Sequence, residues 1–271
     1  MKQKTQINKL LARELATRAL DAPPAWAKYA LGQDLWEMQG QILLSLRDHR
    51  RTAVKACHAS GKSYVAASAV LWWLDKYEDG MVVITAPTWI QVKKVLWGEI
   101  HSALTASPLD WPTAMQAELI FSPNHYAIGR STSHGVNVQG FHGGHVLFLV
   151  DEASGIPKDI WDGIDSISAG GDVRVLAIGN PIGVDSEFYQ FFHRFRADWN
   201  TLTISAYDTP NIKGLSPEDI KQLDAKGLDN NVMPKLITRR YVREKLDNFG
   251  TDSPEYQMRC LLYTSPSPRD S

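Results

Sequence analysis

The stretch that decides the fold is Val54-Lys55-Ala56-Cys57-His58-Ala59-Ser60-Gly61-Lys62-Ser63. An apolar run over residues 52–56 leads into it, and a helical pattern over residues 64–74 follows it. A short strand, a tight loop ending in Gly-Lys-Ser and a helix make up a phosphate-binding loop, in which backbone N–H groups point at an anion. In such a loop Lys62 reaches the terminal phosphates and the Ser63 hydroxyl binds Mg²⁺. The alternative is a plain strand-to-helix turn with a surface lysine.

One position of this loop departs from the usual pattern. Ala56 stands where the motif ordinarily has its first glycine. The loop therefore either tolerates a Cβ at this position or binds its anion weakly. Tolerance is favoured, because later stretches of the chain supply other parts of a nucleotide site.

The composition is that of an ordinary globular chain of 271 residues with 44% hydrophobic residues. Its net charge of −1 gives no global basic field that would indicate nucleic acid, so such a contact must come from local patches. There is no apolar run of about 18 residues, and the N-terminus is polar, so we expect an unprocessed cytosolic protein without a membrane span. For the two cysteines, Cys57 and Cys260, we expect neither a disulfide nor a metal cluster.

Continuous apolar runs over residues 81–86, 145–150 and 173–178 predict strands that are buried on both faces, as in a parallel sheet. Residues 119–122 and 126–130 predict an antiparallel, hairpin-like insertion, and residues 201–206 predict a further strand. Helical patterns cover residues 7–20, 39–46, 64–74, 87–101, 157–164, 188–195, 216–225 and 235–248.

Polar residues follow two of the predicted buried strands. Asp151 and Glu152 come directly after the strand at 145–150, where an aspartate can join the metal shell and a glutamate can deprotonate a water. A solvated turn is the alternative, and it is weakened by the Gly-Lys-Ser loop in the same chain. Asn180 ends the strand at 173–178 and would sense the γ-phosphate, although turn chemistry also explains Gly-Asn-Pro.

Two further patterns remain open between a functional and a structural interpretation. Trp36, followed three residues later by Gln39, suits a site that stacks on adenine and hydrogen-bonds its edge, but it also suits a core tryptophan and a surface glutamine. The helix predicted at 235–248 is basic, which suits either a phosphate-contact face or a solvated helix surface. Its basic residues are Arg239, Arg240, Arg243 and Lys245.

Seven stretches of the sequence occur in one order and, as a set, resemble the large terminase subunit of tailed bacteriophages over about residues 30 to 259. They are Lys55 to Ser63, Ala86-Pro87-Thr88 with Gln91, Gln139-Gly140-Phe141-His142, Asp151-Glu152-Ala153-Ser154-Gly155, Gly179-Asn180-Pro181, Ser205 to Asn211, and Asp252 to Gln257.

This resemblance implies an α/β fold of the P-loop NTPase (ASCE) type, with a doubly wound, mostly parallel sheet flanked by helices. It implies an ATPase that uses ATP and Mg²⁺ to drive double-stranded DNA into a procapsid. It also implies a portal protein and a small terminase subunit as partners, a homo-oligomeric ring on the portal, no membrane contact, and the cytoplasm of the infected bacterial host as location.

Carried over by position, the resemblance also implies residue roles. Lys62 and Glu152 would be catalytic, with Glu152 as the base; Asn180 would couple hydrolysis to movement; and Arg130 is similar in position to an arginine finger offered to a neighbouring subunit. Ser63 and Asp151 would hold the metal. The nucleotide would be bound by Ala56, Cys57, His58, Ala59, Ser60, Gly61, Lys62 and Ser63, with Trp36 and Gln39 at the adenine.

Two departures from the family pattern affect these expectations. His58 stands where several relatives have an arginine, which leaves open whether it or a more distant arginine stabilises the transition state. Residues 260–270 also look like the translation of a transposase-based sequencing adapter, so the nuclease domain of the family is missing and DNA cleavage is not expected.

We therefore divide the chain into an N-terminal helical arm at 1–30, an ATPase core at 31–212, a helical linker or subdomain at 213–259, and a disordered tail at 260–271. Two other functions remain open. One is a superfamily-2-like helicase, and the other is a non-catalytic, nucleotide-gated DNA-binding module, which Ala56 and His58 would suit.

Overall fold

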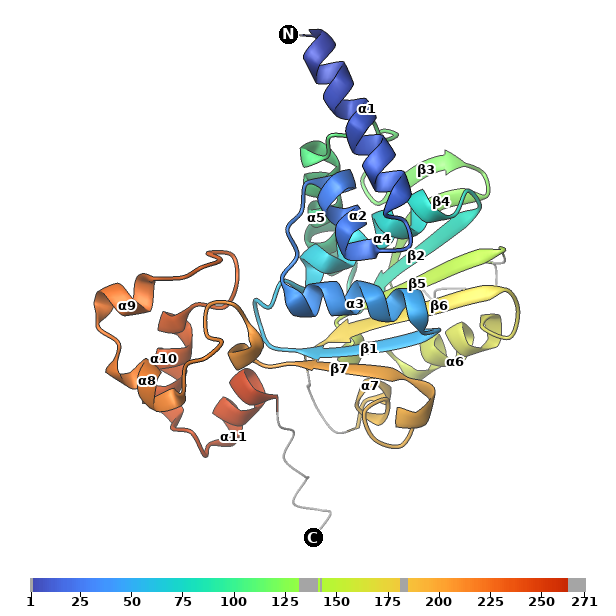
Figure 1. Ribbon diagram of the computed structural model, residues 1–271. Coiled ribbons are helices and arrows are strands. Elements are labelled where there is room, and N and C mark those ends of the chain that lie inside the picture. Colours follow the sequence, from blue (N-terminus) through green and yellow to red (C-terminus); the bar gives the residue numbers. More distant parts are fainter. Residues whose placement is uncertain (1, 132–140, 142, 181–184, 263–271) are drawn as a thin grey trace.

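The computed structural model describes residues 2–131, 141, 143–180 and 185–262 (Figure 1). A seven-stranded sheet with the order β3-β4-β2-β5-β6-β1-β7 forms its centre. All neighbouring strands are parallel except β3 and β4, which pair antiparallel. The strands are β1 (Arg51–Ala56), β2 (Gly80–Ala86), β3 (Glu118–Ser122), β4 (His125–Ser131), β5 (His145–Asp151), β6 (Asp172–Gly179) and β7 (Asn200–Ile204).

Helices cover both faces of the sheet, which confirms the expected α/β fold. On one face lie α1 (Lys2–Arg18), α2 (Pro23–Leu31), α3 (Glu37–Asp48), α4 (Lys62–Lys76), η1 (Gln91–Leu96) and α5 (Trp97–Ala106), and on the other lie α6 (Lys158–Ile167) and α7 (Glu187–Gln190).

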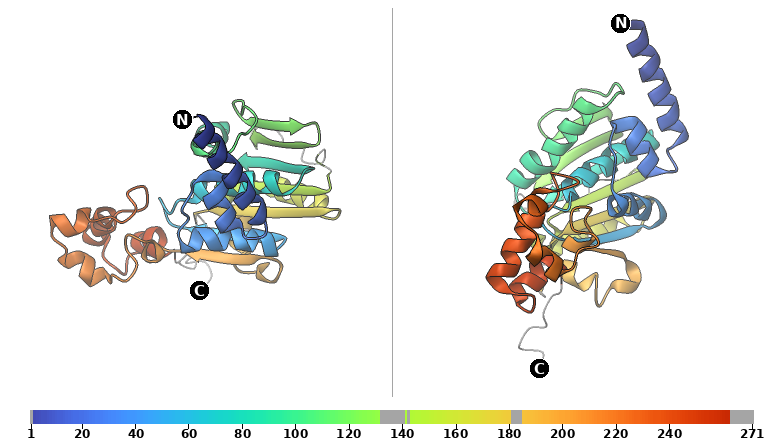
Figure 2. Two further views of the ribbon diagram at one scale, coloured as in Figure 1. Left: turned by 45° about the horizontal axis from the view of Figure 1, so that its top comes forward. Right: turned by 60° about the vertical axis from the view of Figure 1, so that its left-hand side comes forward.

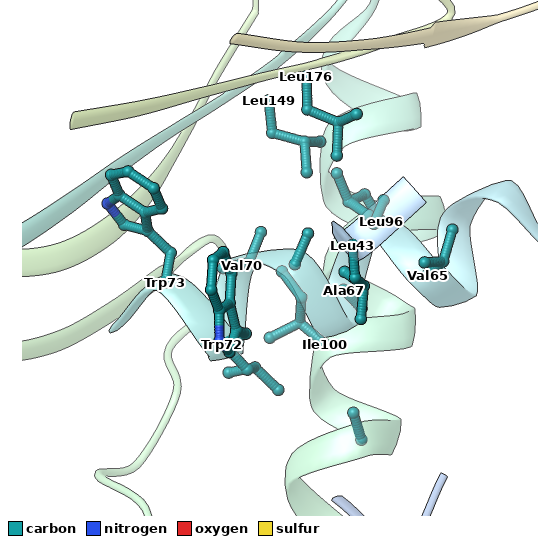
Figure 3. Close-up of a cluster of buried hydrophobic side chains, with 14 of the residues drawn as sticks. Leu43, Val65, Ala67, Val70, Trp72, Trp73, Leu96, Ile100, Leu149 and Leu176 are labelled. Carbon is teal, nitrogen blue, oxygen red and sulfur yellow. The ribbon is translucent and has the colours of Figure 1, made fainter. Parts of the chain in front are cut away.

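Alternate residues of each central strand face opposite cores, as the period of two requires. In β5, Leu147 and Leu149 belong to the larger cluster, while Phe148 and Val150 belong to the smaller one. Figure 3 shows Leu149 and Leu176 of the sheet facing side chains of α4, including Trp72 and Trp73. Because both faces of the strands are covered, the apolar runs in the sequence are continuous rather than alternating.

After β7 the chain enters a helical subdomain, residues 205–262, that lies beside the sheet in both views of Figure 2. It has its own small core, which contains Ile220, Val242 and Tyr256, and Cys57 of the binding loop belongs to the same cluster. Its elements are η6 (Ala206–Asp208), α8 (Pro217–Gln222), α9 (Ala225–Asp229), α10 (Arg239–Phe249), α11 (Pro254–Tyr256) and η7 (Gln257–Leu261).

Three predicted helices differ from the observed ones. The helix predicted at 188–195 is only α7, because its following aromatic residues turn back onto the sheet, where Phe191 stacks on Trp199. The helix predicted at 216–225 ends early, and Asp224 caps a second one by accepting from the Gly227 N–H. The helix predicted at 235–248 begins only at Arg239, after the Thr238 cap.

The ends of the chain also pack more closely than expected. Helix α2 belongs to the main core through Trp26, and Trp72 Nε1 donates to the carbonyl of Leu20. At the other end Cys260 and Leu262 are buried in the helical subdomain, so residues 260–262 are not disordered as expected for the tail, and residues 263–271 lie outside the described residues. In the described part of the chain no helix is long and apolar enough to span a membrane.

Candidate nucleotide-binding site

The loop between β1 and α4 has the geometry that the sequence predicts for phosphate binding. Gly61 adopts a φ of 81°, in the left-handed region, and α4 begins at the next residue, so the helix N-terminus faces the loop. The Ser60 hydroxyl donates to the carbonyl of Cys57 at 3.0 Å and closes the turn. Ala56 is the last residue of β1 and its side chain is buried in the main core, so the loop accommodates the Cβ that replaces the usual glycine.

Gln39 holds the loop from the side of α3. Its Nε2 donates to the carbonyl of Gly61 at 3.2 Å, while its Oε1 accepts the backbone N–H of Trp36 at 3.3 Å. A Cβ at Gly61 would lie 2.4 Å from that Nε2, so the contact depends on glycine at this position. Trp36 itself is only 8% exposed and packs in the main core. The structure therefore brings Gln39 to the loop but places Trp36 in the core.

The Lys62 side chain turns back across the loop. Its Nζ donates to the carbonyl of Cys57 at 3.0 Å and to Oδ1 of Asn180 at 2.5 Å. Burial lowers the pKa of Lys62, and the nearby carboxylates of Glu152 and Asp151 oppose this effect. Burial likewise raises the pKa of the Cys57 thiol to about 12, so this cysteine fills the loop as an un-ionised side chain.

The two predicted acids lie at the end of β5, two strands from β1 in the sheet order. Asp151 is 4% exposed, and its Oδ1 accepts the backbone N–H of Glu152 at 3.0 Å. Burial, followed by the charge of Glu152, raises the pKa of Asp151 to about 6. Glu152 has a φ of 47°, a rare conformation for a residue with a side chain, and such strain is common at functional sites.

A cavity of about 730 Å³ brings these elements together. Lys62, Ser63 and Glu152 line it, and so does Gln39. Its remaining wall was not expected from the sequence, because it comes from residues 232–236 of the helical subdomain. The full lining is Asp34, Gln39, His58, Ala59, Ser60, Gly61, Lys62, Ser63, Tyr64, Glu99, Glu152, Val232, Met233, Pro234, Lys235 and Leu236.

Two hydrogen-bond sets hold this unexpected wall in place. The Ile237 N–H donates to the carbonyl of Ala59 at 2.8 Å, which ties the subdomain to the loop. The Asn211 side chain then bonds the backbone of Met233 and of Ile237. No local pattern in the sequence signals these contacts, since they join segments far apart in the chain.

The donor set fits a magnesium ion. Mg²⁺ prefers oxygen ligands and usually takes one or two protein groups, with water and phosphate oxygens completing its shell. Ser63 offers a hydroxyl in the cavity, and Asp151 offers a buried carboxylate whose raised pKa shows that it is ionised at a cost. A cation beside this carboxylate would offset that cost.

Arg130 lies apart from these residues. It is near the end of β4, four strand spacings or about 19 Å from β1, and on the same edge of the sheet because the strands between are parallel. Its Nη1 donates to the carbonyl of Gly129 at 3.0 Å, and its side chain is 46% exposed. It is therefore distant from the loop of its own chain and accessible to another molecule.

The basic residues of α10 are largely used within the subdomain. Arg239 donates to the carbonyls of Asn211 and Gly227, and Arg240 pairs with Asp229. Arg243 donates to the carbonyls of Ile220 and Lys221. Their contacts stabilise the fold of the subdomain, and this favours the structural interpretation of the basic helix. Residue 139 of the stretch Gln139-Gly140-Phe141-His142 lies outside the described residues, as do 140 and 142.

The sheet order, the loop and the acids after β5 define a P-loop nucleoside-triphosphatase fold. No family model matches the chain. A probable terminase large subunit of Enterobacteria phage P7 is 20% identical over 239 residues, which are 83% of this chain and 44% of that protein. The chain thus spans less than half the length of this curated relative.

Solved structures agree with this similarity. The large terminase ATPase domain of Thermus phage P74-26 has a TM-score of 0.57 at 17% identity, and the match covers 85% of this chain and 94% of that one. The HK97 large terminase has a TM-score of 0.58 at 14% identity, over 84% and 50%. The large terminase of a thermophilic bacteriophage, solved in complex with ADP, has 0.56 at 14%, over 83% and 52%. The expected resemblance to phage large terminase subunits is confirmed, and the fold is that of their ATPase domains.

Proposed function

We propose that this chain is the ATPase part of a phage DNA-packaging motor, which hydrolyses ATP with Mg²⁺ and moves double-stranded DNA into a procapsid. One observation carries the proposal: a single cavity is lined by the Lys62 amine, the Ser63 hydroxyl and the Glu152 carboxylate. A phosphate-binding cation, a metal-binding hydroxyl and a candidate base thus face the same space. The relatives named above support the assignment, and the terminase of the thermophilic bacteriophage was solved with ADP.

Each residue has a distinct task in this proposal. The loop N–H groups and the Lys62 ammonium bind the phosphates and balance their charge. Ser63 and Asp151 would hold Mg²⁺, which would neutralise the charge that develops on the phosphates. Glu152 orients a water and accepts its proton. Asn180 bonds Lys62 from the end of β6 and so connects the nucleotide site to the sheet.

The proposed partners are double-stranded DNA, the portal protein and the small terminase subunit, in the cytoplasm of an infected bacterium. Several copies would form a ring on the portal, with Arg130 of each copy reaching the site of its neighbour. The exposed position of Arg130, distant from its own loop, supports this arrangement.

DNA-stimulated ATP turnover of two variants tests the function. Lys62→Ala removes the phosphate-binding amine and Glu152→Gln removes the base, so we expect each to lower kcat by about a hundredfold or more. Lys158→Ala and Glu14→Gln are matched controls on exposed ion pairs and should hydrolyse ATP normally. Turnover that survives in both site variants would contradict the proposal.

A non-catalytic, nucleotide-gated module is the outcome if the wild-type chain binds ATP tightly but does not turn it over, even with DNA and neighbouring subunits present. The helicase alternative is not favoured, because the structural relatives reported above are terminases.

A further inference from the structure

Asn180 lies between two side chains of the binding loop. Its Oδ1 is 2.5 Å from Nζ of Lys62, and its Nδ2 is 2.9 Å from each ring nitrogen of His58. Asn180 is only 4% exposed. The amide therefore has a partner at both ends and little room to exchange them for water.

The chemistry of Lys62 fixes which way the Asn180 amide points. An ammonium group only donates hydrogen bonds, so the atom of Asn180 that faces it must be the oxygen. A reversed amide would place an NH₂ group against the ammonium, with two donors in contact and no acceptor. The NH₂ group must therefore face His58.

This orientation in turn fixes the state of His58. The Asn180 NH₂ group donates, so the His58 ring has to offer an acceptor. A neutral imidazole has one unprotonated nitrogen in either tautomer, whereas an imidazolium has none. Because Nδ2 is equally close to both ring nitrogens, either neutral tautomer satisfies the contact.

The surroundings of His58 favour the neutral ring. Burial, followed by the charge of Lys62, lowers the pKa of His58. Arg259 of the helical subdomain acts in the same direction, and the Glu152 carboxylate opposes it.

We propose that His58 is a positioning residue for Asn180: its unprotonated ring nitrogen holds the amide so that Oδ1 stays on the Lys62 ammonium. This inference rests on the proposed function, because the residue it acts on would couple phosphate chemistry to the sheet. An arginine or lysine at this position only donates hydrogen bonds and cannot hold the amide in this way. The histidine is thus a functional alternative to the arginine expected at this position of the loop.

Kinetics of His58 variants give the first test. His58→Leu removes the acceptor, so we expect kcat for ATP to fall about tenfold while KM changes less than about threefold. His58→Gln restores an acceptor carbonyl and should recover most of the loss, whereas His58→Arg should not. His193→Leu, on an exposed histidine far from the loop, should behave as wild type. Equal loss in His58→Gln and His58→Leu would overturn the inference.

A double-mutant cycle then separates positioning from a general structural role. If His58 acts through Asn180, adding His58→Leu to Asn180→Ala should cost less than about twofold in kcat, although it costs about tenfold alone. The same fold-loss in both backgrounds would show that His58 acts independently of Asn180, which would overturn the inference while leaving the ATPase proposal intact. Thermal unfolding of each variant checks that the fold is retained.

A spectroscopic arm does not depend on turnover. In ¹⁵N spectra of the wild-type protein at pH 7.5, the His58 ring should show one protonated and one unprotonated nitrogen, and Asn180→Ala should shift the unprotonated resonance. A doubly protonated ring, or a ring unaffected by Asn180→Ala, would overturn the inference. A failure of ATP turnover in the wild type, with this signature present, would instead count against the proposed function alone.

Discussion

Oδ1 of Asn180 accepts a hydrogen bond from Nζ of Lys62 at 2.5 Å, although the two residues are 118 positions apart in the chain. The contact joins the end of β6 to the start of α4, which flank the loop from two directions. Lys62 therefore does not extend freely into the cavity but is held by the sheet and by the carbonyl of Cys57. The arrangement of the site around it leads to four predictions.

The first prediction concerns the buried carboxylate of Asp151. Its pKa is raised from 3.8 to about 6, so the folded protein binds its proton more tightly than the unfolded chain. This group therefore costs stability at neutral pH, and the cost disappears as the pH falls from about 6 to below 3.8. Asp151→Asn should raise the free energy of unfolding by about 2–3 kcal/mol at pH 7.5.

Denaturant titrations without Mg²⁺ or nucleotide at pH 7.5 and pH 4 measure this difference between variant and wild type. The difference should shrink at the lower pH, since other titrating groups are common to both proteins and cancel. A difference that stays constant with pH would contradict the raised pKa.

The second prediction concerns Gly61. Gly61→Ala places a side chain at a φ of 81° and a Cβ 2.4 Å from Nε2 of Gln39. Gly214→Ala is a matched control, because Gly214 has a φ of 85° with no atom within 4 Å of the added Cβ. Both changes carry the backbone cost of about 1–2 kcal/mol. Only Gly61→Ala should also weaken nucleotide binding, which calorimetry with ADP measures, and equal ADP affinity in the two variants would refute the role of Gln39.

The third prediction concerns the attachment of the N-terminal helices. Asp75 accepts hydrogen bonds from Trp26 Nε1 at 2.7 Å and from Arg13 at 2.6 Å, and Trp26 is fully buried. Asp75→Ala leaves the indole N–H without its partner, which should destabilise the protein by about 1–3 kcal/mol. Asp75→Asn retains an acceptor and should cost less. Asp21→Ala, which removes an exposed ion pair with Lys76, should change the midpoint of thermal unfolding little.

Much of the fold follows from local sequence, and the reason is visible in β2 and β5. Their residues are buried on both faces, so hydrophobicity alone marks them, and the loop at Gly61 needs a residue type that is rare elsewhere. The acids after β5 could be predicted because parallel strands end at a common edge.

Other features could not be predicted because they depend on distant contacts. The wall at residues 232–236 reaches the loop through Ile237 and Ala59, and nothing in either segment encodes the other. Trp36 shows a second limit, since the same spacing suits a stacking platform and a core residue, and only packing distinguishes them. The aromatic run after Phe188 was wrongly predicted to be one helix, because its rings pack better in a series of turns.

The fourth prediction tests whether Arg130 acts in a neighbouring copy. Arg130→Ala should bind nucleotide normally but lose DNA-stimulated turnover. Mixing it with Glu152→Gln, which is inactive but keeps Arg130, should restore activity, because mixed assemblies contain an intact site next to an intact arginine. The control mixes Arg130→Ala with the double variant Arg130→Ala/Glu152→Gln, which supplies no arginine. Equal turnover in the two mixtures would exclude an arginine supplied in trans.

The hydrogen bond from the Ile237 N–H to the carbonyl of Ala59 gives the helical subdomain a mechanical lever on the loop. Ala59 already has a strained φ of 52°, so its peptide has little freedom to absorb a pull. A rotation of the subdomain about the end of β7 has to stretch this bond, break it or turn the loop with it. Torque and loop geometry are therefore linked through a single backbone amide.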